Sequence, residues 1–110
     1  MRVLVCGGRD YADEHAVLVA LSGLPPGTVV VHGAARGADN LAERAAGSLG
    51  LVTEPHPADW ERLGRRAGPV GNAEMLATGV DLVIAFPGGR GTADMVARAR
   101  RAGVPVRLVG

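Results

Sequence analysis

Short aliphatic runs alternate with segments of helical periodicity along the whole chain. Five unbroken runs rich in valine are predicted to be strands, at residues 2–6, 28–32, 51–56, 81–86 and 104–108. Four segments between them have apolar residues at helical spacing, at residues 13–22, 38–49, 72–77 and 92–102. Aliphatic runs without apolar–polar alternation are typical of a parallel sheet covered on both faces. The pattern therefore predicts an α/β fold built from strand–helix–strand units.

Residues 57–71 do not follow this alternation. They include two prolines, three glycines, Trp60 and the pair Arg65-Arg66. We expect a long irregular loop here, with room for a short helical turn over residues 59–65. Loops of this length within a compact domain often carry function.

The composition excludes several chemistries. All 12 basic residues are arginine, which excludes both a P-loop lysine and a Schiff-base lysine. The only serines, Ser22 and Ser48, lie in apolar helical runs, so no nucleophile elbow is present. The single cysteine, Cys6, excludes an intramolecular disulfide and a cysteine-rich zinc site. At the end of a buried strand it is expected to act as a small hydrophobic residue rather than a nucleophile.

Length and charge predict one domain, over residues 1–110, with no strong attraction to nucleic acid or membranes. A second hydrophobic core would need roughly another 100 residues. The net charge is +1, so we expect no nucleic-acid partner. No apolar run exceeds six residues, the length of residues 16–21, and the run at 82–86 has five, so none is long enough to span a bilayer. The apolar start is interrupted too early for a signal peptide, and a cytoplasmic protein is expected.

Glycine-rich turns follow three of the predicted strands and lead into helices. Ligands bind beyond the carboxyl ends of parallel strands, where strand order reverses. Bare backbone N–H groups at such turns, together with a helix N-terminus, hold phosphate, and arginines there can bind an oxyanion. The predicted ligand-binding or phosphate-binding residues are Gly7, Gly8, Arg9, Gly33, Arg36, Gly37, Trp60, Asn72, Pro87, Gly88, Gly89, Arg90, Gly91 and Thr92.

Some of these residues also have a purely structural interpretation. The glycines at residues 88–91 fit a tight turn in which Thr92 caps the following helix. Asp39 and Asn40 are expected to cap the helix at 38–49, with Asn40 and Glu43 at capping-box spacing. The two interpretations of Trp60 stay open: it stacks on a base and closes the pocket, or it anchors the long loop as an apolar plug.

The remaining aromatic and imidazole side chains near this edge are also expected to have either a ligand-binding or a structural role. Tyr11 lies in a polar loop and is a further candidate for stacking on a ligand. His32 and His56 reach the ligand edge, where structural hydrogen bonds are expected of them. His15 is expected to face away on its helix. The three histidines share no metal-ligand spacing, so no metal site is expected.

Together these motifs resemble the SLOG superfamily, which includes DprA and the Lonely Guy enzymes. They are Gly-Gly-Arg-Asp, His-Gly-Ala-Ala-Arg-Gly-Ala-Asp, Pro-Ala-Asp-Trp and Phe-Pro-Gly-Gly-Arg-Gly-Thr. Within the superfamily the chain is similar to the small YspA-like, YpsA-related branch, over residues 1–109. The resemblance implies a Rossmann-like three-layer α/β/α sandwich with a five-stranded parallel sheet in the order 3-2-1-4-5. Residues 7–10 and 88–92 would then line one pocket.

The resemblance also shows what this chain lacks. Lonely Guy phosphoribohydrolases end their Pro-Gly-Gly-x-Gly-Thr-x-x-Glu motif with a catalytic glutamate, and Met95 stands at that position here. Asp94 is adjacent, but one residue along a helix turns a side chain by about 100°, so it is not expected to substitute. The second catalytic residue of those enzymes, an arginine, is replaced by Gly71, where YspA-like relatives also commonly have arginine. Keeping the glycines while losing both catalytic side chains favours binding over hydrolysis.

The leading hypothesis is a domain that binds a nucleotide or nucleotide-derived ligand as a sensor or carrier, with no required cofactor. The alternative is a nucleotide-processing hydrolase, such as an N-glycosidase, with Asp10 or Asp39 as its acidic group. A DprA-like nucleic-acid binder is disfavoured by the near-neutral charge. A homo-oligomer is also expected, because superfamily relatives are typically dimers or larger and residues 16–21 are apolar nearly all round their helix.

Overall fold

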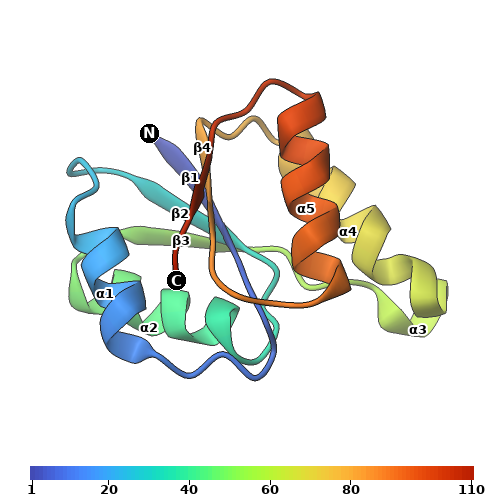
Figure 1. Cartoon of the computed structure of the whole chain (residues 1–110), viewed down its shortest axis with the longest axis horizontal. Helices are drawn as coiled ribbons and strands as arrows, with labels where there is room; N and C mark the ends of the chain where they lie inside the picture. Colours follow the sequence, from blue (N-terminus) through green and yellow to red (C-terminus); the bar gives the residue numbers. More distant parts are fainter.

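The computed structural model describes residues 1–110 and contains one parallel five-stranded sheet. Its strands are β1 (Arg2–Cys6), β2 (Val29–His32), β3 (Val52–Pro55), β4 (Leu82–Ala85) and β5 (Val106–Leu108). They lie in the order β3-β2-β1-β4-β5, with every neighbouring pair parallel. All five predicted strands and the predicted order are confirmed. β1 pairs with β4, so the order of the strands reverses between them (Figure 1).

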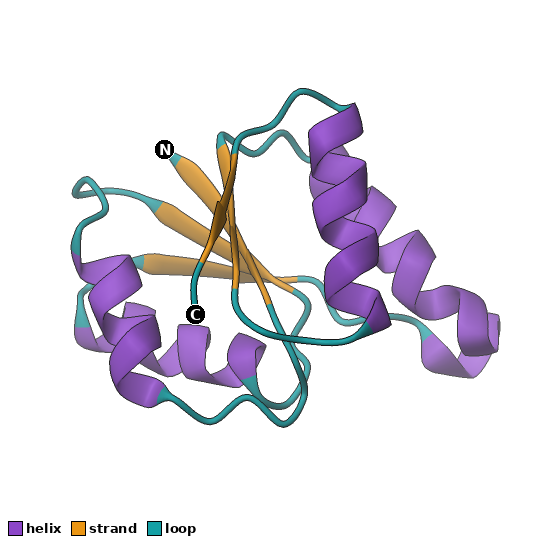
Figure 2. Ribbon diagram, in the orientation of Figure 1, coloured by secondary structure: helices purple, strands orange, loops and turns teal.

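Helices cover both faces of the sheet and complete three layers (Figure 2). They are α1 (Glu14–Ser22), α2 (Ala38–Ser48), α3 (Trp60–Leu63), the 3-10 turn η1 (Gly64–Arg66), α4 (Ala67–Ala77) and α5 (Arg90–Arg101). Successive residues of a strand point to opposite faces. Val3 and Val5 accordingly pack in the cluster with α1 and α2, whereas Leu4 packs in the cluster with Met75 of α4 and Met95 of α5.

The two edge strands are less covered than the unbroken aliphatic runs predict. Val52 of β3 is 62% exposed and Leu108 of β5 is 64% exposed. The inner strand β4 is buried at every residue. Helix α1 buries Val17 and Leu21 and leaves Val19 exposed. No helix combines the length and the hydropathy that a membrane crossing requires.

The helical turn expected over residues 59–65 is confirmed by α3 and η1, but the irregular loop predicted for the rest of residues 57–71 is wrong, because α4 already begins at Ala67. Asp59 begins α3 by accepting a hydrogen bond from the Arg62 N–H at 3.2 Å and pairs with its guanidinium at 2.9 Å. Helix α4 then starts at Ala67, five residues before the predicted start. Pro69 lies in the first turn of α4, where a missing N–H breaks no helical hydrogen bond.

Candidate functional site

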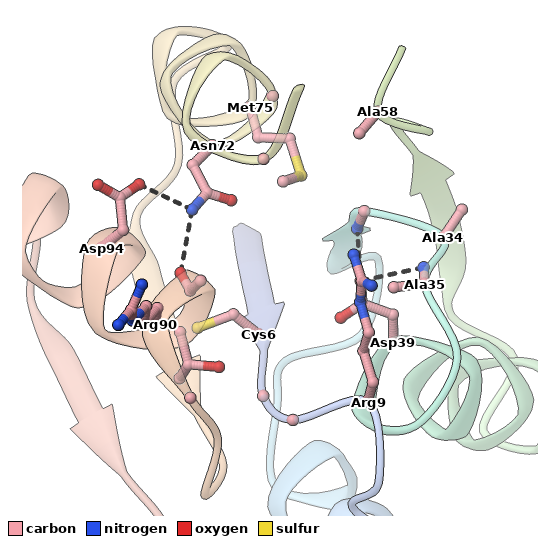
Figure 3. A pocket seen from close by; sticks show the side chains of 18 of the residues that line it. Cys6, Arg9, Ala34, Ala35, Asp39, Ala58, Asn72, Met75, Arg90 and Asp94 are labelled. Atoms are coloured by element: carbon pink, nitrogen blue, oxygen red, sulfur yellow. Dashed lines mark hydrogen bonds between the residues drawn. The ribbon is translucent and has the colours of Figure 1, made fainter. Parts of the chain in front are cut away.

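A cavity of about 950 Å³ opens over the carboxyl ends of the strands, beside the switch point between β1 and β4 (Figure 3). Its wall includes residues 6–10 after β1, 33–36 after β2, 56–58 after β3 and 89–92 at the start of α5. Trp60 and Arg65 contribute from the helical segment, and Asn72 and Met75 from α4. Segments far apart in the sequence thus form one site.

Most of the predicted binding residues lie on this wall. They are Gly7, Gly8, Arg9, Gly33, Arg36, Trp60, Asn72, Gly89, Arg90, Gly91 and Thr92, together with the weaker candidates Asp10 and Asp39. Gly37, Pro87 and Gly88 are not part of it.

The glycines of the turns have two different roles. A β-carbon on Gly7 would stand 2.6 Å from the Ala38 β-carbon, and one on Gly8 would stand 3.0 Å from the Pro87 carbonyl oxygen. These residues are glycine because neighbouring loops pack against them. Apart from their chain neighbours and the helix backbone, no protein atom lies within 4 Å of the β-carbon position of Gly89 or Gly91. Only these two leave the backbone open for close approach of a ligand.

The N-terminus of α5 faces the cavity with unpaired donors. Gly89 is the N-cap, and no side chain caps the helix, so the interpretation of Thr92 as a cap is wrong. The N–H groups of Arg90, Gly91 and Thr92 have no acceptor within the protein. Such groups and the helix dipole together favour an anion.

Asp39 holds the loop after β2 instead of capping α2. Its Oδ2 accepts hydrogen bonds from the N–H groups of Gly33 at 3.1 Å and Ala35 at 3.2 Å. Burial raises the pKa of the Asp39 carboxyl, although these hydrogen bonds and the charge of Arg9 oppose the shift. The capping interpretation is wrong, because Gly37 is the N-cap of α2 and no side chain caps it.

Glu43 does not form the predicted capping box with Asn40 either. Its carboxylate instead contacts His32 Nε2 at 2.8 Å and accepts from the Thr53 hydroxyl at 2.9 Å. These hydrogen bonds lower the pKa of Glu43. His32 Nδ1 accepts from the Ala34 N–H at 3.0 Å, so Nε2 carries the proton that it donates to Glu43. The expected structural role of His32 is the one observed.

On the opposite wall, a polar network joins α4 to α5. Asn72 Nδ2 donates to the Gly91 carbonyl oxygen and to Asp94 Oδ2, both at 3.0 Å. The same Asp94 oxygen accepts from Arg98 Nε at 2.9 Å. Partial burial opposes ionisation of Asp94, but these two hydrogen bonds and the nearby arginine charge outweigh it, so its pKa lies below the usual range.

The structure places the Asp94 side chain on the cavity wall, and its expected failure to replace the glutamate stays a prediction. Met95 is 0% exposed and belongs to the core with Leu4 and Val83. The turn of about 100° between consecutive helix positions that argued against Asp94 explains this arrangement. It directs residue 95 toward the sheet and residue 94 toward α4. The i,i+4 spacing of Asp94 and Arg98 was the available sequence signal.

Arginine supplies the positive charge of the cavity, with four arginines on the wall against three aspartates. Arg36 lies 3.5 Å from Asp10, and both side chains are largely exposed. Arg65 and Arg90 pair with no carboxylate. The guanidinium groups of Arg65 and Arg90 are therefore free to bind a negatively charged ligand.

Trp60 is half exposed at the cavity wall, where the Arg9 guanidinium lies 5.0 Å from its ring centroid. The ring also covers Gly68, whose β-carbon position is 3.6 Å from it. Trp60 therefore anchors the helical segment and presents its ring to the cavity at once. Tyr11 does not line the cavity: its ring lies 5.3 Å from that of Phe86, so its interpretation as a stacking residue is wrong.

Cys6 and His56 also face the cavity. Burial raises the pKa of the Cys6 thiol to about 12, which keeps it protonated and poorly nucleophilic. His56 Nε2 lies 2.7 Å from Glu54 Oε2. No group of three or more histidine, cysteine, aspartate or glutamate side chains is placed to hold a metal ion.

The fold and the position of the cavity define a Rossmann-like α/β domain with a candidate ligand site at the switch point. Two solved structures share this fold. DNA processing protein A (DprA) from Streptococcus pneumoniae matches with a TM-score of 0.80 and 23% identity over 99% of this chain. The chain spans half the length of that protein. The C-terminal domain of a hydrogenase from Pyrococcus furiosus matches with a TM-score of 0.56 and 15% identity, over 97% of this chain and 89% of that one.

Sequence similarity identifies the family. The profile of the YspA, cpYpsA-related SLOG family (YAcAr) matches residues 1–63. The Gene 61 protein of Mycobacterium phage D29 is 43% identical over 116 residues, covering 96% of this chain and 93% of that protein. The chain belongs to the YspA, cpYpsA-related SLOG family.

Proposed function

We propose that the cavity binds a nucleotide or nucleotide-derived ligand and that the protein acts as a sensor or carrier. The observation that carries this proposal is the start of α5, where three unpaired N–H groups face a cavity walled by four arginines. The volume of the cavity, about 950 Å³, lies toward the upper end of the range for small-molecule sites, roughly 300–1,000 Å³.

The parts of a nucleotide match different parts of the wall. The phosphate lies at Gly89 and Gly91, where the backbone is open, and Arg90 adds a positive charge. Trp60, half exposed with the Arg9 guanidinium over its ring, offers an aromatic surface and a positive charge to a base. Met75 and Cys6 add apolar surface to the same wall.

Thermal unfolding and calorimetry with nucleoside monophosphates, NAD and ADP-ribose test the proposal. A ligand present at 100 times its Kd stabilises the folded state by about 2.7 kcal/mol. Arg90→Ala is expected to weaken binding at least about tenfold, the effect of losing a charge-assisted hydrogen bond. Arg107→Ala removes an exposed arginine from β5 and should leave the affinity unchanged. No stabilisation by any of these compounds contradicts the proposal.

Hydrolysis of the ligand is a second candidate function, and Asp94 is the observation that favours it. The two acidic groups that the sequence suggested for hydrolysis are less well placed. Asp10 is 95% exposed, and Asp39 already accepts hydrogen bonds from two backbone N–H groups. Asp94 is fixed at the wall beside the start of α5 by Asn72 and Arg98, where its carboxylate can orient a water or stabilise a developing positive charge, although its lowered pKa makes it a weak base. Chromatography of the same incubations separates the two functions: release of a free base establishes turnover, whereas stabilisation without products supports binding alone. A cytoplasmic location and a homo-oligomer remain further proposals.

A further inference from the structure

We propose that Asn72 makes the site selective for ribonucleotides by accepting a hydrogen bond from a ribose hydroxyl. This inference rests on the proposed function and names the part of the ligand that Asn72 reads. It follows from the fixed orientation of the Asn72 amide and from the place of that amide beside the start of α5.

The orientation of the amide is fixed by its partners. Both N–H bonds of Asn72 Nδ2 are used, one by the Gly91 carbonyl oxygen and one by Asp94 Oδ2. A flipped amide would put Oδ1 against these two acceptors and lose both hydrogen bonds. Arg98 holds Asp94 from the other side at 2.9 Å, so the carboxylate stays in place.

Asn72 Oδ1 is therefore the amide atom that faces the cavity and stays free to bind a ligand. In Figure 3 it takes part in no drawn hydrogen bond and points across the cavity, toward the wall that carries Ala34. An amide oxygen has lone pairs and no proton, so it accepts hydrogen bonds and repels a phosphate oxygen. The ligand group next to Asn72 must be a donor.

The position of Asn72 relative to α5 indicates which donor this is. The Gly91 carbonyl that orients Asn72 belongs to the same residue as one of the three unpaired N–H groups. Asn72 is thereby held against the first turn of α5, so a donor on its Oδ1 lies near the turn whose N–H groups bind the anion. In a 5′-nucleotide the group next to the phosphate is the ribose, whose hydroxyls are donors, and the base lies farther away.

Calorimetry with AMP, GMP, CMP and UMP and with their 2′,3′-dideoxy analogues tests the inference. The wild-type protein is expected to bind the ribonucleotide roughly fivefold to tenfold more tightly, the effect of one neutral hydrogen bond. Asn72→Ala should bind both sugars equally, at the affinity of the dideoxy form. Glu74→Ala, an exposed substitution on the same helix and outside this cavity, is the matched control and should preserve the preference.

The outcomes distinguish this inference from the proposed function. Equal binding of both sugars by the wild-type protein overturns the role of Asn72 and leaves nucleotide binding intact. An unchanged preference in Asn72→Ala also overturns it. No binding of any nucleotide refutes the proposed function itself. The wild-type comparison needs no variant, so it decides the question even where Asn72→Ala fails to fold.

Discussion

The α-carbon of Gly37 lies against the carbonyl oxygen of Gly8, leaving no room for a side chain at residue 37. The same Gly8 oxygen accepts hydrogen bonds from Ala38 at 3.1 Å and Tyr11 at 3.2 Å. Gly37 has φ 78° and ψ −128°, a conformation that is essentially restricted to glycine. This contact joins the loops after β1 and β2 behind the cavity wall.

Gly37→Ala is therefore expected to destabilise the fold by about 3 kcal/mol or more, from backbone strain and from contact with Gly8. Gly47→Ala is the matched control. Gly47 lies within α2 with no atom near its β-carbon position, and alanine there should stabilise the protein by roughly 0.5–1 kcal/mol. Urea unfolding of the two variants measures both effects. A Gly37→Ala protein as stable as the wild type would contradict the described packing.

Met95→Glu, which restores the glutamate of the Lonely Guy motif, is expected to destabilise the protein by about 3 kcal/mol or more without giving hydrolysis. Residue 95 is fully buried among aliphatic side chains, so a glutamate there has no partner for its charge. Met95→Leu keeps the volume and should cost less than about 1.5 kcal/mol. Denaturant unfolding and chromatography of nucleotide incubations check both points. A stable Met95→Glu protein that releases free base would show that residue 95 faces the ligand.

The lowered pKa of Glu54 predicts that the folded protein loses stability in acid. Hydrogen bonds from Arg2, at 2.9 and 2.7 Å, and from His56 lower the pKa of its carboxyl to about 2. The folded state therefore binds fewer protons at this site than the unfolded chain. The stabilisation is complete above pH of about 4.5 and is lost as the pH falls toward 2. Thermal unfolding from pH 6 to about 2 should show a shallower decline for Glu54→Gln, and parallel curves would exclude this contribution.

Cys6 is expected to resist alkylation in the folded protein. Because its pKa is raised to about 12, only a negligible fraction is thiolate at pH 8. Iodoacetamide should label it rapidly only after unfolding in guanidinium chloride, as mass spectrometry would measure. Rapid labelling of the native protein at pH 8 would show a more accessible or more ionised thiol than the structure has.

Helix α1 offers a test of the proposed homo-oligomer. Val19 is 56% exposed and Leu18 is 38% exposed, side by side on a helix that already buries Val17 and Leu21. If this surface joins two copies, Val19→Glu should convert the protein to a monomer in sedimentation velocity. Arg100→Glu, a charge change on the exposed surface of α5 on the other side of the sheet, is the comparison variant. A wild-type protein that is monomeric at every concentration would refute the proposal.

Hydrophobic pattern alone was sufficient to predict the strands, because a buried parallel strand needs an unbroken aliphatic run. The four main helices were predicted for a similar reason, although α4 begins at Ala67 instead of residue 72. Proline and glycine at residues 68, 69 and 71 indicated a loop, yet the first turn of a helix tolerates Pro69, and each glycine costs only about 1 kcal/mol relative to alanine. Packing of this segment against Trp60 outweighs the low helix propensity of its glycines and its proline.

The sequence by itself determined the strands, the glycine turns at one edge of the sheet and the resemblance that gave the order of the strands. Only the tertiary structure decided which side chains of those turns face the cavity. Asp39 binds loop N–H groups rather than capping α2, and Asp94 instead of Met95 faces the cavity with Asn72. The physical reason is that periodicity acts within one element, whereas these contacts join loops and helices that are distant in the chain. Their partners exist only once the sheet has brought those elements together.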